Sequence, residues 1–151
     1  MGKGVEVGID WHNTLEVVGR VPQWNTDAIM ELRKRGVGVN ILSFMGRDSH
    51  WRRQEFYKQS MAWVGAGECN RIMDCTSKVG EGGKLELYKQ WGVSAVFDDS
   101  DAVCKECVKG GFAVFPIRTR YEKHAWATEL GMQTYESLAE AIQHYLAGLK
   151  D

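Results

Sequence analysis

Residues 5–15, which read VEVGIDWHNTL, join a strand pattern to a candidate site for chemistry. Apolar residues alternate up to Ile9, the acid Asp10 follows at once, and His12 and Asn13 are typical of a turn. The pattern predicts a buried strand that delivers Asp10 at its carboxyl end. Open α/β sheets bind their ligands at that end of their strands.

A second apolar run, SAVFDD at residues 94–99, also closes on acids, here Asp98 and Asp99. If the two strands lie side by side, these acids and Asp10 meet in one crevice. Carboxylate oxygens are ligands that hard divalent cations prefer. The sequence therefore predicts a cation site at the two strand ends.

The residues between these runs alternate helix and strand patterns. Residues 25–27, Asn-Thr-Asp, predict the N-cap of a helix that ends at Gly36, and residues 37–43 predict a second strand. This alternation indicates a parallel sheet with a right-handed crossover. Ser43, which ends the second strand, is therefore expected at the same sheet edge as Asp10.

A helix predicted within residues 46–63 interleaves aromatic and basic residues. One interpretation packs the rings on the sheet and leaves the charges in solvent. The other places Arg47, with His50, Arg52 or Arg53, at the mouth of the site, where it would grip a phosphate.

Further strands are predicted at residues 71–75 and 112–117, and a glycine-rich loop at 76–83 leads into a helix at Lys84. Because the loop lacks the GxxxxGK[ST] pattern, a P-loop is not indicated. Five strands separated by helices predict an α/β fold, a three-layer α/β/α sandwich, and the chain of 151 residues is expected to form a single domain.

The formal net charge of -1 provides no global field for a polyanion, so nucleic acid would need a local basic patch. The chain has no apolar run of about 18 residues and no signal-peptide pattern, so no membrane span is indicated. We expect a cytoplasmic protein.

The cysteines are Cys69, Cys75, Cys104 and Cys107. The second pair forms a CxxC, but it lies inside a helical pattern, and the first pair is spaced loosely for a structural zinc site. The sequence favours reduced, partly buried thiols over zinc.

Taken together, the strand ends resemble the motifs of the haloacid dehalogenase-like (HAD) hydrolase superfamily. Its first motif, Asp-x-Asp-x-Thr/Val, stands here as DWHNT at residues 10–14, with His12 in place of the second aspartate. The resemblance implies the strand order 3-2-1-4-5, which places the strands of Asp10 and Asp98 next to each other. It also implies a Mg²⁺-dependent phosphatase, a phosphomonoester hydrolase.

The other family motifs have candidates in the same order along the chain. Ser43 ends a strand, Lys84 begins a helix, and the pair Asp98-Asp99 ends another strand. Lys78 is an alternative for the motif lysine.

The resemblance implies a role for each matched residue. Asp10 would attack phosphorus and form an aspartyl-phosphate, Ser43 would hydrogen-bond a phosphoryl oxygen, and Lys84 would neutralise negative charge. The family's Mg²⁺ ligands correspond to a carboxylate oxygen of Asp10, the backbone carbonyl of His12, and Asp98 or Asp99. The candidates for substrate binding are Asn13, Thr14 and Arg47.

His12 stands where the family has its general acid and base. An imidazole can protonate a leaving alcohol and activate water, but its reach and charge differ from those of a carboxylate. Two hypotheses therefore stay open: a slow phosphatase, and a catalytically inactive module that binds phosphate and metal or regulates a partner.

Caps in this superfamily are inserted after the first motif or between the second and third. The intervals from Asp10 to Ser43 and from Ser43 to Lys84 are too short for a large cap once their helices are counted. Open sites in the superfamily imply a macromolecular substrate, or closure by another subunit of an oligomer.

A nucleic-acid 3′-phosphate is one such macromolecular substrate. On the basic aromatic helix, Arg52 lies one turn before Phe56, and Arg53 one turn before Tyr57, so each cation would sit beside a ring on which a base could stack. A nucleic-acid 3′-phosphatase is thus a further hypothesis.

Overall fold

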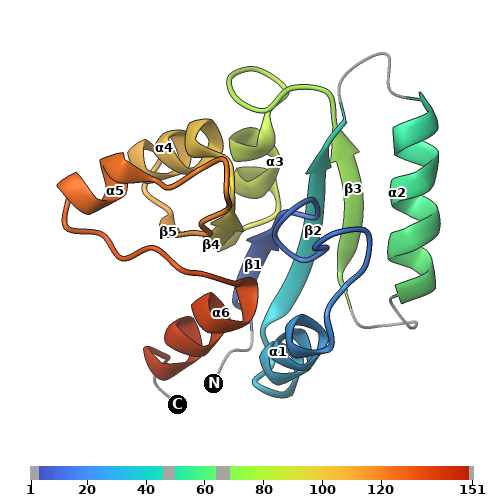
Figure 1. The fold of residues 1–151 in the computed structure, drawn as a ribbon, viewed down its shortest axis with the longest axis horizontal. Helices are drawn as coiled ribbons and strands as arrows, with labels where there is room; N and C mark the ends of the chain where they lie inside the picture. Colours follow the sequence, from blue (N-terminus) through green and yellow to red (C-terminus); the bar gives the residue numbers. More distant parts are fainter. Residues whose placement is uncertain (1–3, 46–49, 64–68, 150–151) are drawn as a thin grey trace.

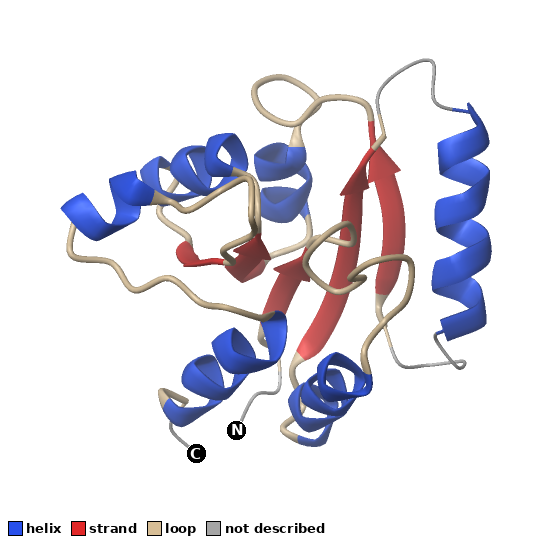
Figure 2. Cartoon of the chain, in the orientation of Figure 1, coloured by secondary structure: helices blue, strands red, loops and turns tan. Residues whose placement is uncertain are grey.

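The computed structural model describes residues 4–45, 50–63 and 69–149, and these residues build a parallel sheet between two layers of helices (Figures 1 and 2). The strands are β1 (Glu6–Ile9), β2 (Gly38–Phe44), β3 (Arg71–Cys75), β4 (Val93–Asp98) and β5 (Ala113–Pro116). Their order in the sheet is β3-β2-β1-β4-β5, and every neighbouring pair is parallel. The predicted order 3-2-1-4-5 is confirmed.

The helices are α1 (Gln23–Lys34), α2 (His50–Trp63), α3 (Lys84–Gln90), α4 (Asp101–Lys109), α5 (Ala125–Glu129) and α6 (Leu138–Ala147). On one face of the sheet, α1, α2 and α6 bury Ile29, Phe56 and Ile142 in a common core. On the other face, α3 and α4 contribute Tyr88 and Val103 to a second core. The predicted three-layer sandwich is therefore confirmed, with α1 and α6 side by side in Figure 1.

Successive side chains of a strand point to opposite faces of the sheet, so a strand can contribute residues to both cores. In β4, Phe97 packs into the first core while the preceding Val96 packs into the second. The amide of Asp10 continues the ladder beyond β1 and donates to the carbonyl of Phe97 (3.0 Å). Strand pairing thereby places Asp10 beside Asp98, the residue that follows Phe97.

A close approach between Gly8 and Tyr88 positions α3 against β1. A Cβ at Gly8 would lie 2.3 Å from a ring carbon of Tyr88, so only glycine admits the ring here. Lys84 lies one helical turn before Tyr88, on the same face of α3. This packing brings Lys84 next to the strand that carries Asp10.

The predicted N-cap at residues 25–27 is wrong, because α1 begins at Gln23, directly after Pro22. Pro22 is the N-cap, with an extended backbone (φ -62°, ψ 148°), and its missing N–H costs no helical hydrogen bond at this position. Asn25 is instead buried inside the helix, where its amide donates to the carbonyls of Thr14 (3.2 Å) and Leu15 (3.1 Å). Its side chain therefore fixes the loop that follows β1.

No described helix combines the length and the apolar composition that a bilayer crossing requires. Cys75, Cys104 and Cys107 are buried thiols, as predicted. Burial raises the pKa of Cys75 to about 11 and that of Cys107 to about 12, which keeps both thiols protonated.

Candidate active site

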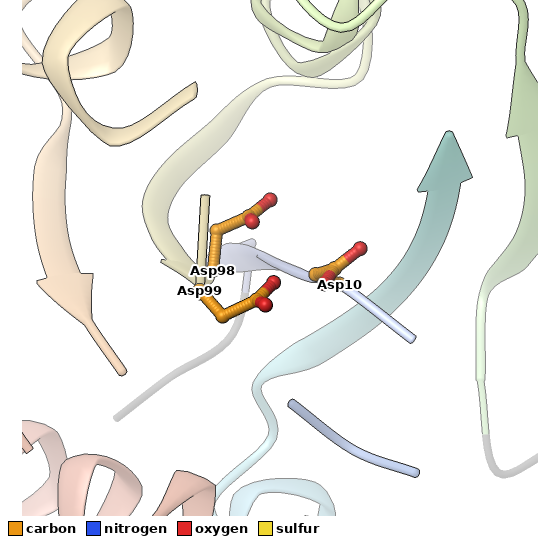
Figure 3. A group of neighbouring side chains, drawn as sticks. All are labelled: Asp10, Asp98 and Asp99. Carbon is orange, nitrogen blue, oxygen red and sulfur yellow. The ribbon is translucent and has the colours of Figure 1, made fainter. Parts of the chain in front are cut away.

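Three carboxylates converge where β1 and β4 end, as Figure 3 shows. Asp10, Asp98 and Asp99 each offer one oxygen, and these oxygens lie within 4.8 Å of one another. Asp10 and Asp98 are buried, whereas Asp99 is half-buried. Among the described residues, no other group of three or more acidic, histidine or cysteine side chains is close enough to share a cation.

Lys84 lies between two of these acids. Its Nζ is 2.7 Å from Oδ1 of Asp10 and 2.7 Å from Oδ2 of Asp98, and its side chain is 2% exposed. Burial by itself would lower the pKa of Lys84, but the two carboxylates hold that pKa well above its usual value. The ammonium is therefore a permanent charge at the base of the site.

One ammonium does not balance three acids. Burial and the negative charge of Asp10 raise the pKa of Asp98, and the same two causes raise the pKa of Asp99 to about 9. A bound divalent cation would favour the ionised form of all three acids, because three carboxylates and one ammonium carry two negative formal charges that the cation balances.

The loop after β1 fixes the orientation of Asp10. The hydroxyl of Thr14 donates to Oδ2 of Asp10 (3.2 Å), and Asn13 adopts a left-handed backbone with φ of 59°, which asparagine tolerates. On the neighbouring strand, the amide of Ser100 donates to Oδ1 of Asp98 (2.9 Å). Both acids are thus held in place by residues that follow their strands.

Ser43 lies near the end of β2, on the other side of β1 from Asp98. Its hydroxyl is buried and has no hydrogen-bond partner among the described residues. Buried hydroxyls are nearly always paired, so an orphaned one at a site is typical of a group that bonds to a ligand.

His12 is held by a residue that the sequence analysis did not single out. Its Nδ1 lies 3.2 Å from Oε1 of Glu16, while Oε2 of Glu16 accepts a bond from the amide of Gly19 (2.7 Å). Burial raises the pKa of Glu16, but these bonds outweigh burial and hold the pKa below its usual value. The carboxylate is therefore charged and orients the imidazole.

A cleft of about 300 Å³ opens above the carboxylates. It is lined by predicted site residues, namely Asp10, His12, Asn13, Ser43, Lys84, Asp98 and Asp99. Thr14 reaches the site through its bond to Asp10, whereas Arg47 lies outside the described residues. Phe44, Ser100, Val103 and Glu122 also line the cleft and were not predicted.

Two of the unpredicted lining residues lie next to predicted ones in the chain. Phe44 comes directly after Ser43, and Ser100 directly after Asp99, so each continues a strand end that the sequence had marked. Glu122 comes from the segment after β5, where the sequence shows no motif.

Two more cations, Arg52 and Lys78, line the cleft. Nζ of Lys78 lies 5.4 Å from the ring centre of Phe44, whereas Lys84 contacts two carboxylates. Of the two lysines that the sequence offered, Lys84 is the one that the fold brings to Asp10.

The predicted stacking platform on α2 is wrong for Phe56. This ring is 1% exposed and packs edge-on against Trp11, with ring centres 5.6 Å apart. The hydroxyl of Tyr57 donates to Asp74 (2.6 Å), which also accepts from Nε of Arg53 (2.6 Å). Phe56 therefore belongs to the core, and Tyr57 and Arg53 connect α2 to β3.

No family model and no curated protein matches the chain by sequence. Solved structures with a similar fold include D,D-heptose 1,7-bisphosphate phosphatase from Burkholderia thailandensis, with a TM-score of 0.73 and 13% identity over 95% of this chain and 99% of that one. The same phosphatase from B. bronchiseptica, complexed with magnesium and phosphate, gives a TM-score of 0.66 and 13% identity over 96% of this chain and 99% of that one.

Proposed function

From the haloacid dehalogenase-like fold of this chain, we propose that the protein is a Mg²⁺-dependent phosphomonoester hydrolase that acts through an aspartyl-phosphate. The observation that carries the proposal is the convergence of Asp10, Asp98 and Asp99, with Lys84 paired to the first two. The cleft there is also lined by Ser43, whose hydroxyl is unpaired among the described residues. The magnesium and phosphate bound to the B. bronchiseptica enzyme lend further support.

The donor set fits a hard divalent cation. All three side chains offer carboxylate oxygens, and once all three are ionised, one Mg²⁺ balances the two negative charges that remain after the Lys84 ammonium is counted. The ligands would be a carboxylate oxygen of Asp10, the backbone carbonyl of His12, and Asp98 or Asp99. When bound, Mg²⁺ would shield negative charge, so that an anionic phosphate could approach an anionic nucleophile.

In the proposed reaction, a carboxylate oxygen of Asp10 attacks phosphorus while the bond from phosphorus to the leaving alcohol breaks. Lys84 offsets the charge on Asp10, and the hydroxyl of Ser43 donates to a phosphoryl oxygen. Water then attacks the aspartyl-phosphate and releases inorganic phosphate, which restores Asp10. Asn13, Thr14 and Arg47 are the proposed contacts to the substrate.

His12 is the proposed acid and base. With Nδ1 directed at the Glu16 carboxylate, Nε2 is the ring nitrogen that can serve the cleft. In the first step it would protonate the leaving alcohol, and in the second it would accept a proton from the attacking water. Glu16 would stabilise the imidazolium that exists before the first step and forms again in the second.

The test is hydrolysis of p-nitrophenyl phosphate with Mg²⁺. We expect metal-dependent turnover that EDTA removes and that Asp10→Asn abolishes, because an amide is not a nucleophile. Wild-type turnover no higher than that of Asp10→Asn would end the proposal.

A second candidate, an inactive phosphate-binding or regulatory module, is favoured by one observation, namely histidine at position 12. Substitution His12→Asp restores the carboxylate that the family carries there. Metal-dependent rates that are comparable in wild type and His12→Asp would rule out the inactive module. A variant that hydrolyses substrate while the wild type does not would support it.

The substrate class follows most directly from the names of the structural neighbours, which act on a small phosphorylated sugar. We therefore propose a small phosphomonoester. A macromolecular substrate such as a nucleic-acid 3′-phosphate, closure of the cleft in an oligomer, the absence of a large cap and a cytoplasmic location remain predictions.

A further inference from the structure

A second hollow, of about 320 Å³, borders the catalytic cleft. We call it the Trp24 hollow; its apolar lining consists of Val17, Val18, Trp24, Ile117, Tyr121 and Leu138. None of the proposed catalytic residues lines this hollow.

The hollow and the cleft share part of their lining. Asn13 lines both spaces, and Thr14, whose hydroxyl donates to Asp10, lines the hollow. The segment after β5 also lines both spaces, since Tyr121 lines the hollow and the adjacent Glu122 lines the cleft. A molecule whose phosphate lies at Asp10 could therefore extend directly into the hollow.

Large apolar side chains around the hollow are exposed to solvent. Val18 is 92% exposed, Tyr121 74% and Trp24 60%. Val18 also adopts a left-handed backbone, with φ of 51°, which is strained for a β-branched residue. Bonds between Val17 and Arg20 hold this turn in place. A cluster of exposed apolar groups beside a proposed catalytic site is typical of a surface that binds a ligand.

Several polar side chains of the hollow are hydrogen-bonded within the protein. Asn25 donates to two carbonyls and accepts from the amide of Ala139, and Thr119 accepts from the amides of Tyr121 and Glu122. Arg120 also lines the hollow, and its guanidinium lies 5.0 Å from the ring centre of Tyr121.

Arg118 and Ser137 at the same rim are engaged as well. Arg118 donates to Thr134 (2.6 Å) and pairs with Glu136 (3.6 Å), and Ser137 accepts from the amide of Glu140 (3.1 Å). Because these polar groups are engaged and the large apolar side chains are exposed, the hollow matches an apolar ligand better than a polyol.

We infer that the Trp24 hollow binds the leaving group of the substrate and selects phosphomonoesters whose alcohol carries a planar apolar ring. The inference rests on the proposed hydrolase function, since it takes the phosphate to lie at Asp10. The indole of Trp24 and the ring of Tyr121 would contact the planar ring, and the valines would cover its edge.

The test compares ethyl phosphate with naphthylethyl phosphate, two esters whose leaving alcohols have similar acidity. We expect kcat/KM for the naphthyl ester to be about tenfold higher or more, because the ring buries apolar surface. A hexose phosphate should show no such gain. Equal kcat/KM values for the two esters would overturn the inference.

Trp24→Ala and Tyr121→Ala should lower the naphthyl-to-ethyl ratio toward one. Trp51→Ala is the matched control, because Trp51 is a similarly exposed indole (70%) on α2, away from the hollow, and it should leave the ratio unchanged. A ratio that survives both hollow variants would show that the ring binds elsewhere and would overturn the inference.

A binding experiment tests this inference independently of the proposed hydrolase function. Calorimetric titration with ethylphosphonate and naphthylethylphosphonate in the presence of Mg²⁺ needs no turnover. Tighter binding of the naphthyl compound, lost in Trp24→Ala, would support the hollow even if neither ester were hydrolysed. Equal affinities, or no binding of either phosphonate, would overturn it even if both esters were hydrolysed.

Discussion

The ammonium of Lys84 lies 2.7 Å from the carboxylate of Asp10, although 74 positions separate the two residues in the chain. The same ammonium lies 2.7 Å from Asp98. It therefore connects the start of α3 to the ends of β1 and β4, and the charges that would perform the chemistry also hold the sheet edge together.

Replacing this ammonium should destabilise the protein in a metal-dependent way. Lys84→Met leaves two buried carboxylates without their cationic partner, and we expect the free energy of unfolding in EDTA to fall by about 3–5 kcal/mol. Saturating Mg²⁺ should recover part of the loss, because a cation that binds only the folded state stabilises it. Thermal unfolding with and without Mg²⁺ measures both effects.

Lys78→Met is the control for this experiment. Lys78 is exposed and touches no carboxylate of the cluster in the described structure, so its replacement should change stability by no more than about 0.5 kcal/mol. Equal losses in the two variants, or a loss at position 84 that Mg²⁺ does not reduce, would contradict the account.

Proton transfer by His12 should depend on Glu16. His12→Ala is expected to lower kcat about 10²-fold, since positioned proton transfer contributes about 10²–10⁴-fold. Glu16→Gln should lower kcat by a smaller factor with little change in KM, because the amide can still accept from Gly19 but cannot stabilise an imidazolium. Steady-state kinetics with p-nitrophenyl phosphate gives both constants.

Glu31→Gln is the matched control, because Glu31 is an exposed carboxylate that pairs with Lys34 on the surface of α1. It should leave kcat and KM as they are. An unchanged kcat in Glu16→Gln would remove Glu16 from the mechanism.

The bonds from α2 to β3 should make stability depend on pH. Burial raises the pKa of Asp74, but hydrogen bonds from Tyr57 and Arg53 outweigh it and lower the pKa below its usual 3.8. The unfolded chain then binds a proton more readily than the folded one. The contribution of Asp74 is therefore fully present well above pH 3.8 and is lost as the pH falls through the folded-state pKa.

Urea unfolding of wild type and Asp74→Asn across this range tests the dependence. The difference between their free energies of unfolding should be constant near neutral pH and should shrink as the pH falls below 3.8. A difference that is independent of pH would show that Asp74 has no such linkage, and one that grows in acid would show the opposite linkage.

Gly8→Ala should push α3 away from β1. The new Cβ would lie 2.3 Å from the Tyr88 ring, and overpacking of this kind typically costs about 1–3 kcal/mol. Because Lys84 lies on the same helix face, kcat for p-nitrophenyl phosphate should fall together with the melting temperature. Gly148→Ala, where the nearest atom is 3.5 Å away, should be neutral or slightly stabilising.

The parts of this account that could be predicted from the sequence depend on strand periodicity. Asp10, Ser43 and Asp98 each end an apolar strand, and parallel strands bring their carboxyl ends to one edge, so their convergence follows from the pattern. The choice between Lys84 and Lys78 did not follow, because it depends on how Tyr88 packs against Gly8 across the sheet.

The contacts of Asn25 and Glu16, which support the site, could not be predicted from the sequence either. Asn25 looks like an N-cap in the one-dimensional pattern, yet its amide bonds to the loop after β1. Glu16 lies in a segment without a regular pattern, and only the folded turn brings it to His12. In both cases the side chain serves a tertiary contact that local propensity does not encode.

A crystal structure of the protein grown with Mg²⁺ and fluoroberyllate is the most direct test of the central claim, because beryllium bonds to a nucleophilic carboxylate as phosphorus would. We predict beryllium attached to Asp10, a fluoride near the hydroxyl of Ser43, and the cation held by Asp10 with Asp98 or Asp99. Beryllium on another side chain, or a cation bound away from these three carboxylates, would contradict the account.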